Sequence, residues 1–255
     1  MYQLATQPQS IGKVLDNSMR LFTASFSKIF VLVLIMVVVS AAPYLMEPTL
    51  NFDFEQPTST TYSLITIFWF IPMLIIIFTC YGAIYARIGA IMHNRELSLL
   101  DSLKIGIKKL VPIIVASLLY VLAIFGGMIL LIIPGFILML TLLFYMPLIA
   151  SEDEGILSSL KRSHRLVWGN WWRTTSVFVV PGFIIIAVLL LMVSIIGIAI
   201  GIPNMDIKVI ALVENLASSL SSLITTPFLC AVLVSQLHDL KLRKEGGDLA
   251  ARIDG

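Results

Sequence analysis

The sequence predicts an all-α fold: a polytopic membrane helical bundle of six transmembrane helices with three amphipathic helices on the cytoplasmic face. Composition is the first observation, since 58% of the 255 residues are hydrophobic and 13% are charged. A soluble domain is about half apolar and a quarter charged. The second observation is a series of apolar segments near the length of about 20 residues that crosses a bilayer. The third is a one-sided distribution of Lys and Arg. We therefore expect a single integral membrane domain over residues 1–255.

Residues 11–28 predict an amphipathic helix, because apolar side chains from Ile11 to Phe26 recur at helical spacing. The first span follows at 29–46, near the lower length limit. Its end at Ser40-Ala41-Ala42 resembles the cleavage site of a signal peptide. The long amphipathic region before it favours an uncleaved anchor.

A polar loop at 47–62, with acidic residues and no Lys or Arg, leads to the second span at 63–86. The basic stretch after it contains the sequence Ser98-Leu99-Leu100-Asp101, which has the form of a capping box. A second amphipathic helix is therefore predicted at 98–109.

Residues 110–150 are apolar and too long for one span. Pro134-Gly135 is a turn signal, and it predicts a third span at 110–133 and a fourth at 136–150. The fourth is short, so a re-entrant hairpin that returns without crossing is an alternative. Both arrangements leave the flanking segments on the same side of the membrane.

The polar stretch from Ser151 to Arg173 predicts a third surface helix at 155–170, on the inner membrane face. It holds three of the four tryptophans, at the boundary where tryptophan is enriched in membrane proteins. Its expected apolar face consists of Ile156, Leu157, Leu160, Val167 and Trp171. The fifth span (174–202), the sixth span (209–237) and a charged cytoplasmic tail (238–255) complete the chain.

The distribution of basic residues predicts the orientation. With six spans, sixteen of the seventeen Lys and Arg residues lie on one side, and Lys208 alone lies on the other. The positive-inside rule makes the first side cytoplasmic and places both termini there. The order surface helix, span, outer turn, span also occurs three times, which is a weak internal repeat.

Three stretches carry a resemblance to a known family. They are Leu160-Lys161-Arg162-Ser163-His164-Arg165-Leu166-Val167-Trp168-Gly169-Asn170-Trp171-Trp172-Arg173, Ile133-Pro134-Gly135-Phe136, and Leu237-His238-Asp239-Leu240-Lys241-Leu242-Arg243-Lys244-Glu245-Gly246. The chain resembles the YciC-type bacterial inner-membrane proteins, which are related to the membrane domain of some glycerophosphoryl diester phosphodiesterases. The resemblance implies a six-span inner-membrane protein of poorly known role. His164 and His238 stand where the family pattern has Trp and Tyr.

No motif in the sequence predicts catalysis, a metal or a cofactor. His93, His164 and His238 fall in different polar stretches without the spacing of metal ligands. Cys80 and Cys230 sit inside apolar runs and are expected to be small buried residues. We expect a protein that is not an enzyme and that has membrane lipids, not nucleic acid, as its partners.

The leading hypothesis is a role in lipid handling or envelope organisation through the basic, aromatic cytoplasmic surface. Cations near an anionic leaflet each gain about 1 kcal/mol, although the positive-inside rule alone would also place them there. The lipid-headgroup candidates are Lys104, Lys108, Lys109, Lys161, Arg162, Arg165, Trp168, Trp171, Trp172 and Arg173.

The alternative is a transporter or permease subunit. Polar residues in the sixth span recur on one helical face, and such a stripe forms either a substrate path or a close helix contact. The candidates for this path are Glu214, Ser218, Ser221, Ser222 and Thr225. An intramembrane enzyme comes last, because no pair of acids or histidines is predicted at membrane depth.

Overall fold

The computed structural model describes residues 4–50, 60–200 and 207–246, and it confirms the all-α fold class. The helices are α1 (Ile11–Leu50), α2 (Thr60–Met92), α3 (Leu99–Leu130), α4 (Ile132–Thr141), α5 (Tyr145–Glu152), α6 (Ile156–Val167), α7 (Trp171–Ile200) and α8 (Ile207–Lys244). Six segments of the described residues are long and apolar enough to cross a membrane, and α4 with α5 counts as one of them. The chain is therefore a multi-pass membrane protein.

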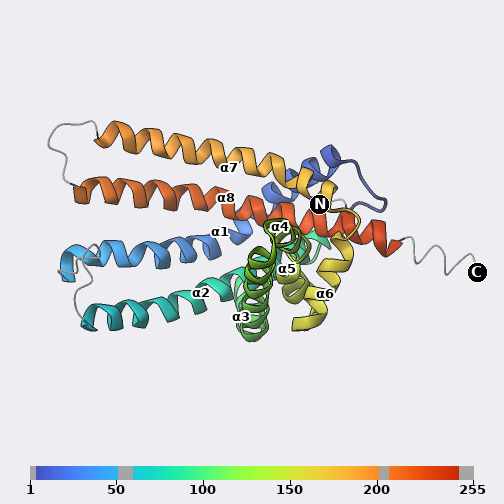
Figure 1. The fold of residues 1–255 in the computed structure, drawn as a ribbon, viewed down its shortest axis with the longest axis horizontal. Helices are drawn as coiled ribbons and strands as arrows, with labels where there is room; N and C mark the ends of the chain where they lie inside the picture. Colours follow the sequence, from blue (N-terminus) through green and yellow to red (C-terminus); the bar gives the residue numbers. More distant parts are fainter. Residues whose placement is uncertain (1–3, 51–59, 201–206, 247–255) are drawn as a thin grey trace, which may run out of the picture.

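Four long helices form the body of the molecule. Figure 1 shows α7, α8, α1 and α2 side by side in this order, with α3, α4 and α5 running across them. The N-terminal segment, α6 and the end of α8 gather at one end of these four helices, which we call the polar end. The main hydrophobic core lies between α1, α2 and α8 and includes Cys80 and Cys230, each 2% exposed, as predicted for small buried residues.

Two predicted surface helices are continuous with the spans that follow them. The structure has one helix, α1, where the sequence predicts separate elements at 11–28 and 29–46. It likewise has one helix, α3, in place of 98–109 and the span from 110. The first junction contains no Gly or Pro, and Pro112, just past the second junction, lies inside α3 without ending it. Each surface helix and its span therefore form one helix. Ser98 caps α3 as predicted, because its side chain accepts the Asp101 N–H.

The predicted turn at Pro134-Gly135 is displaced. The chain breaks at Leu131, which has extended backbone angles (φ −163°, ψ 142°), and Pro134 lies inside the first turn of α4. Proline is tolerated there because the first N–H groups of a helix have no intrahelical partner. The predicted fourth span is itself divided into α4 and α5 by a short turn at residues 142–144.

The start of the predicted tail is helical and packed. α8 continues past residue 237 to Lys244, and Asp239 and Leu240 are 2% and 0% exposed. The buried position of these residues reflects contacts with other helices, which charge alternation in the sequence does not reveal. Residues 247–255, the rest of this tail, lie outside the described part of the chain, as do the loop residues 51–59 and Asn204-Met205-Asp206.

α3 crosses α2 at a pair of glycines. A Cβ on Gly82 would lie 3.1 Å from the Gly106 Cα, and a Cβ on Gly106 would collide with the carbonyl oxygen of Thr79. The two backbones approach so closely that only glycine fits at position 106. This contact fixes the point from which the rest of α3 departs from α2.

Replacing Gly106 with Ala tests this crossing. We expect a loss of about 1–3 kcal/mol in unfolding free energy, because the added methyl group must push α3 from α2. Thermal unfolding of the detergent-solubilised protein measures the loss. Gly126→Ala in the same helix is the matched control, since a Cβ at Gly126 meets nothing within 4 Å. An equal melting temperature for the two variants would contradict the close crossing.

Candidate functional site at the polar end

Asp239 is the centre of a charge cluster that joins α7, α8 and the N-terminal segment. Its carboxylate lies 3.0 Å from Arg173 of α7 and 2.9 Å from Arg243, one turn further along α8. The other carboxylate oxygen accepts the backbone N–H of Gln9 at 2.7 Å. Both arginines also donate to the Gln9 carbonyl oxygen. We call Gln9, Arg173, Asp239 and Arg243 the Asp239 cluster.

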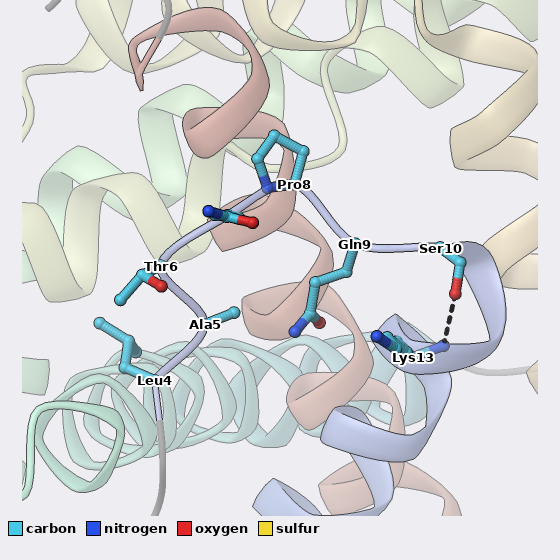
Figure 2. A pocket seen from close by; sticks show the side chains of 8 residues that line it. Leu4, Ala5, Thr6, Pro8, Gln9, Ser10 and Lys13 are labelled. Atoms are coloured by element: carbon cyan, nitrogen blue, oxygen red, sulfur yellow. Dashed lines mark hydrogen bonds between the residues drawn. The ribbon is translucent and has the colours of Figure 1, made fainter. Parts of the chain in front are cut away.

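The N-terminal segment is bound across α8 by these contacts. Figure 2 shows residues 4–10 arching over that helix, and they line most of a pocket of about 330 Å³. Ser10 begins α1, because its side chain accepts the Lys13 N–H at 3.4 Å, the dashed line in Figure 2. The Ala5 carbonyl oxygen also lies 2.8 Å from His238 Nε2. Both ends of the described chain therefore meet at one place.

Arg162 holds a second cluster, which joins α5, α6 and the end of α8. Its guanidinium lies 2.9 Å from Glu152, 2.8 Å from Glu154 and 2.9 Å from Glu245. Lys241 completes it with a 2.7 Å contact to Glu152. We call Glu152, Glu154, Arg162, Lys241 and Glu245 the Arg162 cluster.

The pKa values in this second cluster follow from its contacts. Hydrogen bonding to Glu245, opposed by desolvation and supported by Glu154, raises the pKa of Arg162, which stays charged. Burial alone would raise the pKa of Glu154, but hydrogen bonds from Ser158 and Arg162 bring it below its usual value. Arg162 contacts Glu245 through two bonds and Glu154 through one. A guanidinium donor favours the ionised form of each carboxylate.

A cleft of about 570 Å³ lies between the ends of α2, α5 and α8. Met92, Val234 and Leu237 give it an apolar part, and His93 and His238 face it from α2's end and from α8. Two histidines from distant stretches thus come together. No group of three His, Cys, Asp or Glu residues suited to a metal ion occurs within the described ranges.

α6 packs its apolar face against protein. Leu160, Leu166 and Val167 are buried in cores shared with α5 and α8. Leu157, predicted on the same apolar face, is instead 61% exposed, because the helix is rotated toward the two serines Ser159 and Ser163, which are fully buried. The outward face of α6 therefore presents Leu157, Lys161, Arg165 and Trp168.

The predicted cationic headgroup candidates divide into those with an ion pair and those without one. Arg162 and Arg173 belong to the two clusters, Lys104 pairs with Asp101, and Lys109 pairs with Asp153. Of the predicted cationic candidates, Lys108, Lys161 and Arg165 are exposed and have no ion pair with another described residue.

The aromatic candidates are mostly on the surface. Trp168 and Trp172 are 57% and 69% exposed. Trp171 stacks on Trp172 with ring centroids 3.9 Å apart, and Trp168 lies 5.1 Å from the His164 ring. Exposed indole rings are typical of a membrane–water boundary.

The polar stripe of the sixth span bonds to its own helix. Ser221, Ser222 and Thr225 donate to the carbonyl oxygens of Ala217, Ser219 and Ser221 at 2.7 to 3.0 Å. Hydroxyl groups in helices often donate to a carbonyl oxygen one turn back in this way. The three hydroxyl groups are therefore hydrogen-bonded without a substrate. Ser218 is exposed, and the side chain of Glu214 lies outside the described part of α8.

Sequence reasoning missed both charge clusters. Their partners are far apart in the chain: Arg173 and Asp239 are separated by 66 positions, and Arg162 and Glu245 by 83. The i,i+4 spacing of Asp239 and Arg243 was the one local signal for the first cluster. It does not reveal that Asp239 is buried.

Comparisons with known proteins give a family and no function. The family model described as a domain of unknown function, DUF7847, matches residues 74–236. No curated protein and no solved structure matches the chain. The matched region includes α3 to α6, Arg173 of the Asp239 cluster, and Glu152, Glu154 and Arg162 of the Arg162 cluster.

Asp239→Asn tests the first cluster. Removing the charge leaves Arg173 and Arg243 without their buried partner, and breaking such a pair costs about 3–5 kcal/mol. We expect a lower melting temperature and faster proteolysis within residues 4–10. Asp16→Asn is the control, because its pair with Arg20 is exposed and contributes less than about 1 kcal/mol. If both variants behave alike, Asp239 does not hold the N-terminal segment.

The pH dependence of stability tests the second cluster. The pKa of Glu154 is lower in the folded protein than its ordinary value of 4.5, so its stabilising contribution is complete above that value. The contribution is lost as pH falls through the folded pKa. We expect melting temperature to fall on the acid side of about pH 5 and to fall less steeply in Arg162→Gln. Lys161→Gln, on the exposed face of the same helix, should retain the wild-type profile; a wild-type profile in Arg162→Gln would refute this assignment.

Proposed function

This chain belongs to the DUF7847 family, and we propose that it is a non-enzymatic protein of the bacterial inner (cytoplasmic) membrane that binds anionic lipid headgroups at its polar end. Its role is in lipid handling or envelope organisation. Both termini are cytoplasmic in this proposal, which rests on the positive-inside distribution of Lys and Arg. The resemblance of residues 160–173 to the YciC-type loop supports the same membrane.

The observation that carries the proposal is the outward face of α6. Lys161 and Arg165 are exposed one turn apart on that face, next to the exposed ring of Trp168. The apolar face of α6 packs against α5 and α8, so α6 does not insert this face into the lipid. It is held by protein, and it offers fixed cations and an indole ring to the lipid surface.

The paired arginines have a different part in this proposal. Arg162 and Arg173 neutralise carboxylates within the protein, and they hold α6 and the start of α7 in place. The free cations Lys108, Lys161 and Arg165 make the headgroup contacts. Each such charge near an anionic leaflet gains about 1 kcal/mol, screened by salt.

The test is quenching of tryptophan fluorescence by brominated lipids after reconstitution. We expect brominated phosphatidylglycerol to quench more strongly than brominated phosphatidylcholine, because anionic headgroups collect beside Trp168. In the double variant Lys161→Gln/Arg165→Gln the preference should fall roughly thirtyfold, since two charges of about 1 kcal/mol each are lost. High salt should weaken the wild-type preference.

A charge-conserving variant is the matched control. Lys161→Arg/Arg165→Lys exchanges the two side chains and keeps both charges, so its lipid preference should equal that of the wild type. An unchanged preference in the glutamine variant would show that these cations do not select anionic lipid.

A further inference from the structure

The connection between α3 and α4 contains no group that would hold it in water. The twenty residues from Val121 to Leu140 are apolar, glycine or proline. The other two connections predicted on the same side are polar, with acids in 47–62 and Asn204 and Asp206 before the sixth span. A turn that emerges from the bilayer normally carries such residues, and this one does not.

The same connection is the most exposed apolar region of the described chain. Ile129 and Leu130 are 84% and 78% exposed, and Leu131, Ile132 and Ile133 are 68%, 70% and 73% exposed. Together these five consecutive residues form the tip of a hairpin made by α3 and α4, which we call the hairpin tip. In water such a patch would be strongly unfavourable, whereas acyl chains solvate it.

The few polar groups near the hairpin are satisfied within the protein. Ser117 Oγ lies 2.8 Å from the Tyr145 hydroxyl, Tyr120 donates to the Met139 carbonyl oxygen at 3.1 Å, and Thr141 donates to Leu138. No hydroxyl therefore draws the hairpin toward water.

The backbone at the tip exposes few unpaired donors. Leu131 N–H donates to the Gly127 carbonyl oxygen at 3.0 Å, which completes the last turn of α3. Pro134 has no N–H, which removes one of the unpaired donors in the first turn of α4. A Cβ on Gly127 would lie 3.0 Å from the Gly135 Cα, so the two arms meet at backbone distance. These features suit a turn in hydrocarbon, where each unsatisfied backbone group is costly.

The direction of the hairpin differs from that of the four long helices. In Figure 1, α7, α8, α1 and α2 extend away from the polar end, while α3 and α4 run across them at a level nearer that end. The close crossing of Gly106 on Gly82 fixes this departure. The hairpin therefore does not follow the long helices to their far end.

We propose that the α3–α4 hairpin is a wedge embedded in the leaflet nearest the polar end, and that acyl chains of that leaflet surround its tip. Four helices, α1, α2, α7 and α8, then cross the membrane completely, and the hairpin enters and returns. The proposal does not depend on the headgroup contacts of α6, because it concerns apolar surface and chain topology.

Cysteine accessibility in a Cys80→Ala/Cys230→Ala background tests the wedge. Leu131→Cys is labelled with an impermeant maleimide in right-side-out and inverted vesicles. We expect no more labelling from either side than in the cysteine-free protein, and full labelling after detergent is added. Lys108→Cys and Asn204→Cys are the controls, which should be labelled from opposite sides.

A nitroxide at the same position in phosphatidylcholine–phosphatidylglycerol liposomes gives a second measurement. A tip in acyl chains makes the label accessible to oxygen and inaccessible to a water-soluble nickel complex. Labelling of Leu131→Cys from the Asn204 side would overturn the wedge, because the tip would then cross the bilayer. A label protected from both oxygen and nickel would also overturn it, because a second copy of the chain would cover the tip. Neither result bears on anionic lipid preference, so this test and the α6 test fail independently.

Discussion

The buried carboxylate of Asp239 is the constraint on which the polar end depends. A charge that is 2% exposed is stable only where partners replace its water, and here the partners come from three parts of the chain. Arg173 fixes the start of α7, Arg243 fixes the end of α8, and the Gln9 N–H fixes the segment before α1. Because each partner also needs the carboxylate, these elements have one mutual arrangement.

This way of holding helices together suits a protein in a bilayer. Lipid gives no hydrophobic driving force between apolar helices, so close contacts and polar interactions must define how the helices meet. The structure uses both: α2 and α3 meet through Gly82 and Gly106, and the helix ends meet through charge clusters. The exposed cations on α6 are then free for lipid, because the internal carboxylates already have partners.

The sequence was sufficient to predict the fold class and the six candidate spans. Both follow from composition and from the length of apolar segments, which do not depend on tertiary contacts. It was insufficient for helix ends that depend on tertiary contacts. The alternating charges of residues 238–244 predict a soluble tail. The structure instead continues α8 through them, because Asp239 pairs with Arg173 and Lys241 pairs with Glu152.

The candidate site shows the same limit. Helical periodicity correctly separated Lys161 and Arg165 from the buried residues of α6, but it gave Arg162 the same role and put Leu157 on the wrong face. A helical pattern states which residues share a face; it does not state which neighbour that face meets. The YciC-type resemblance and the lipid role stay predictions, because family membership here brings no known function.

The contact between residues 4–10 and α8 has a consequence for biosynthesis. Residues 4–10 lie on α8, which the ribosome makes after α1 to α7, so these residues have no binding surface until α8 is complete. Domains generally fold as they are synthesised, from the N-terminus, but residues 4–10 must stay unattached while α1 to α7 are made. A product that stops before α8 would lack the partner of residues 4–10, and this unbound segment would expose it to a membrane protease.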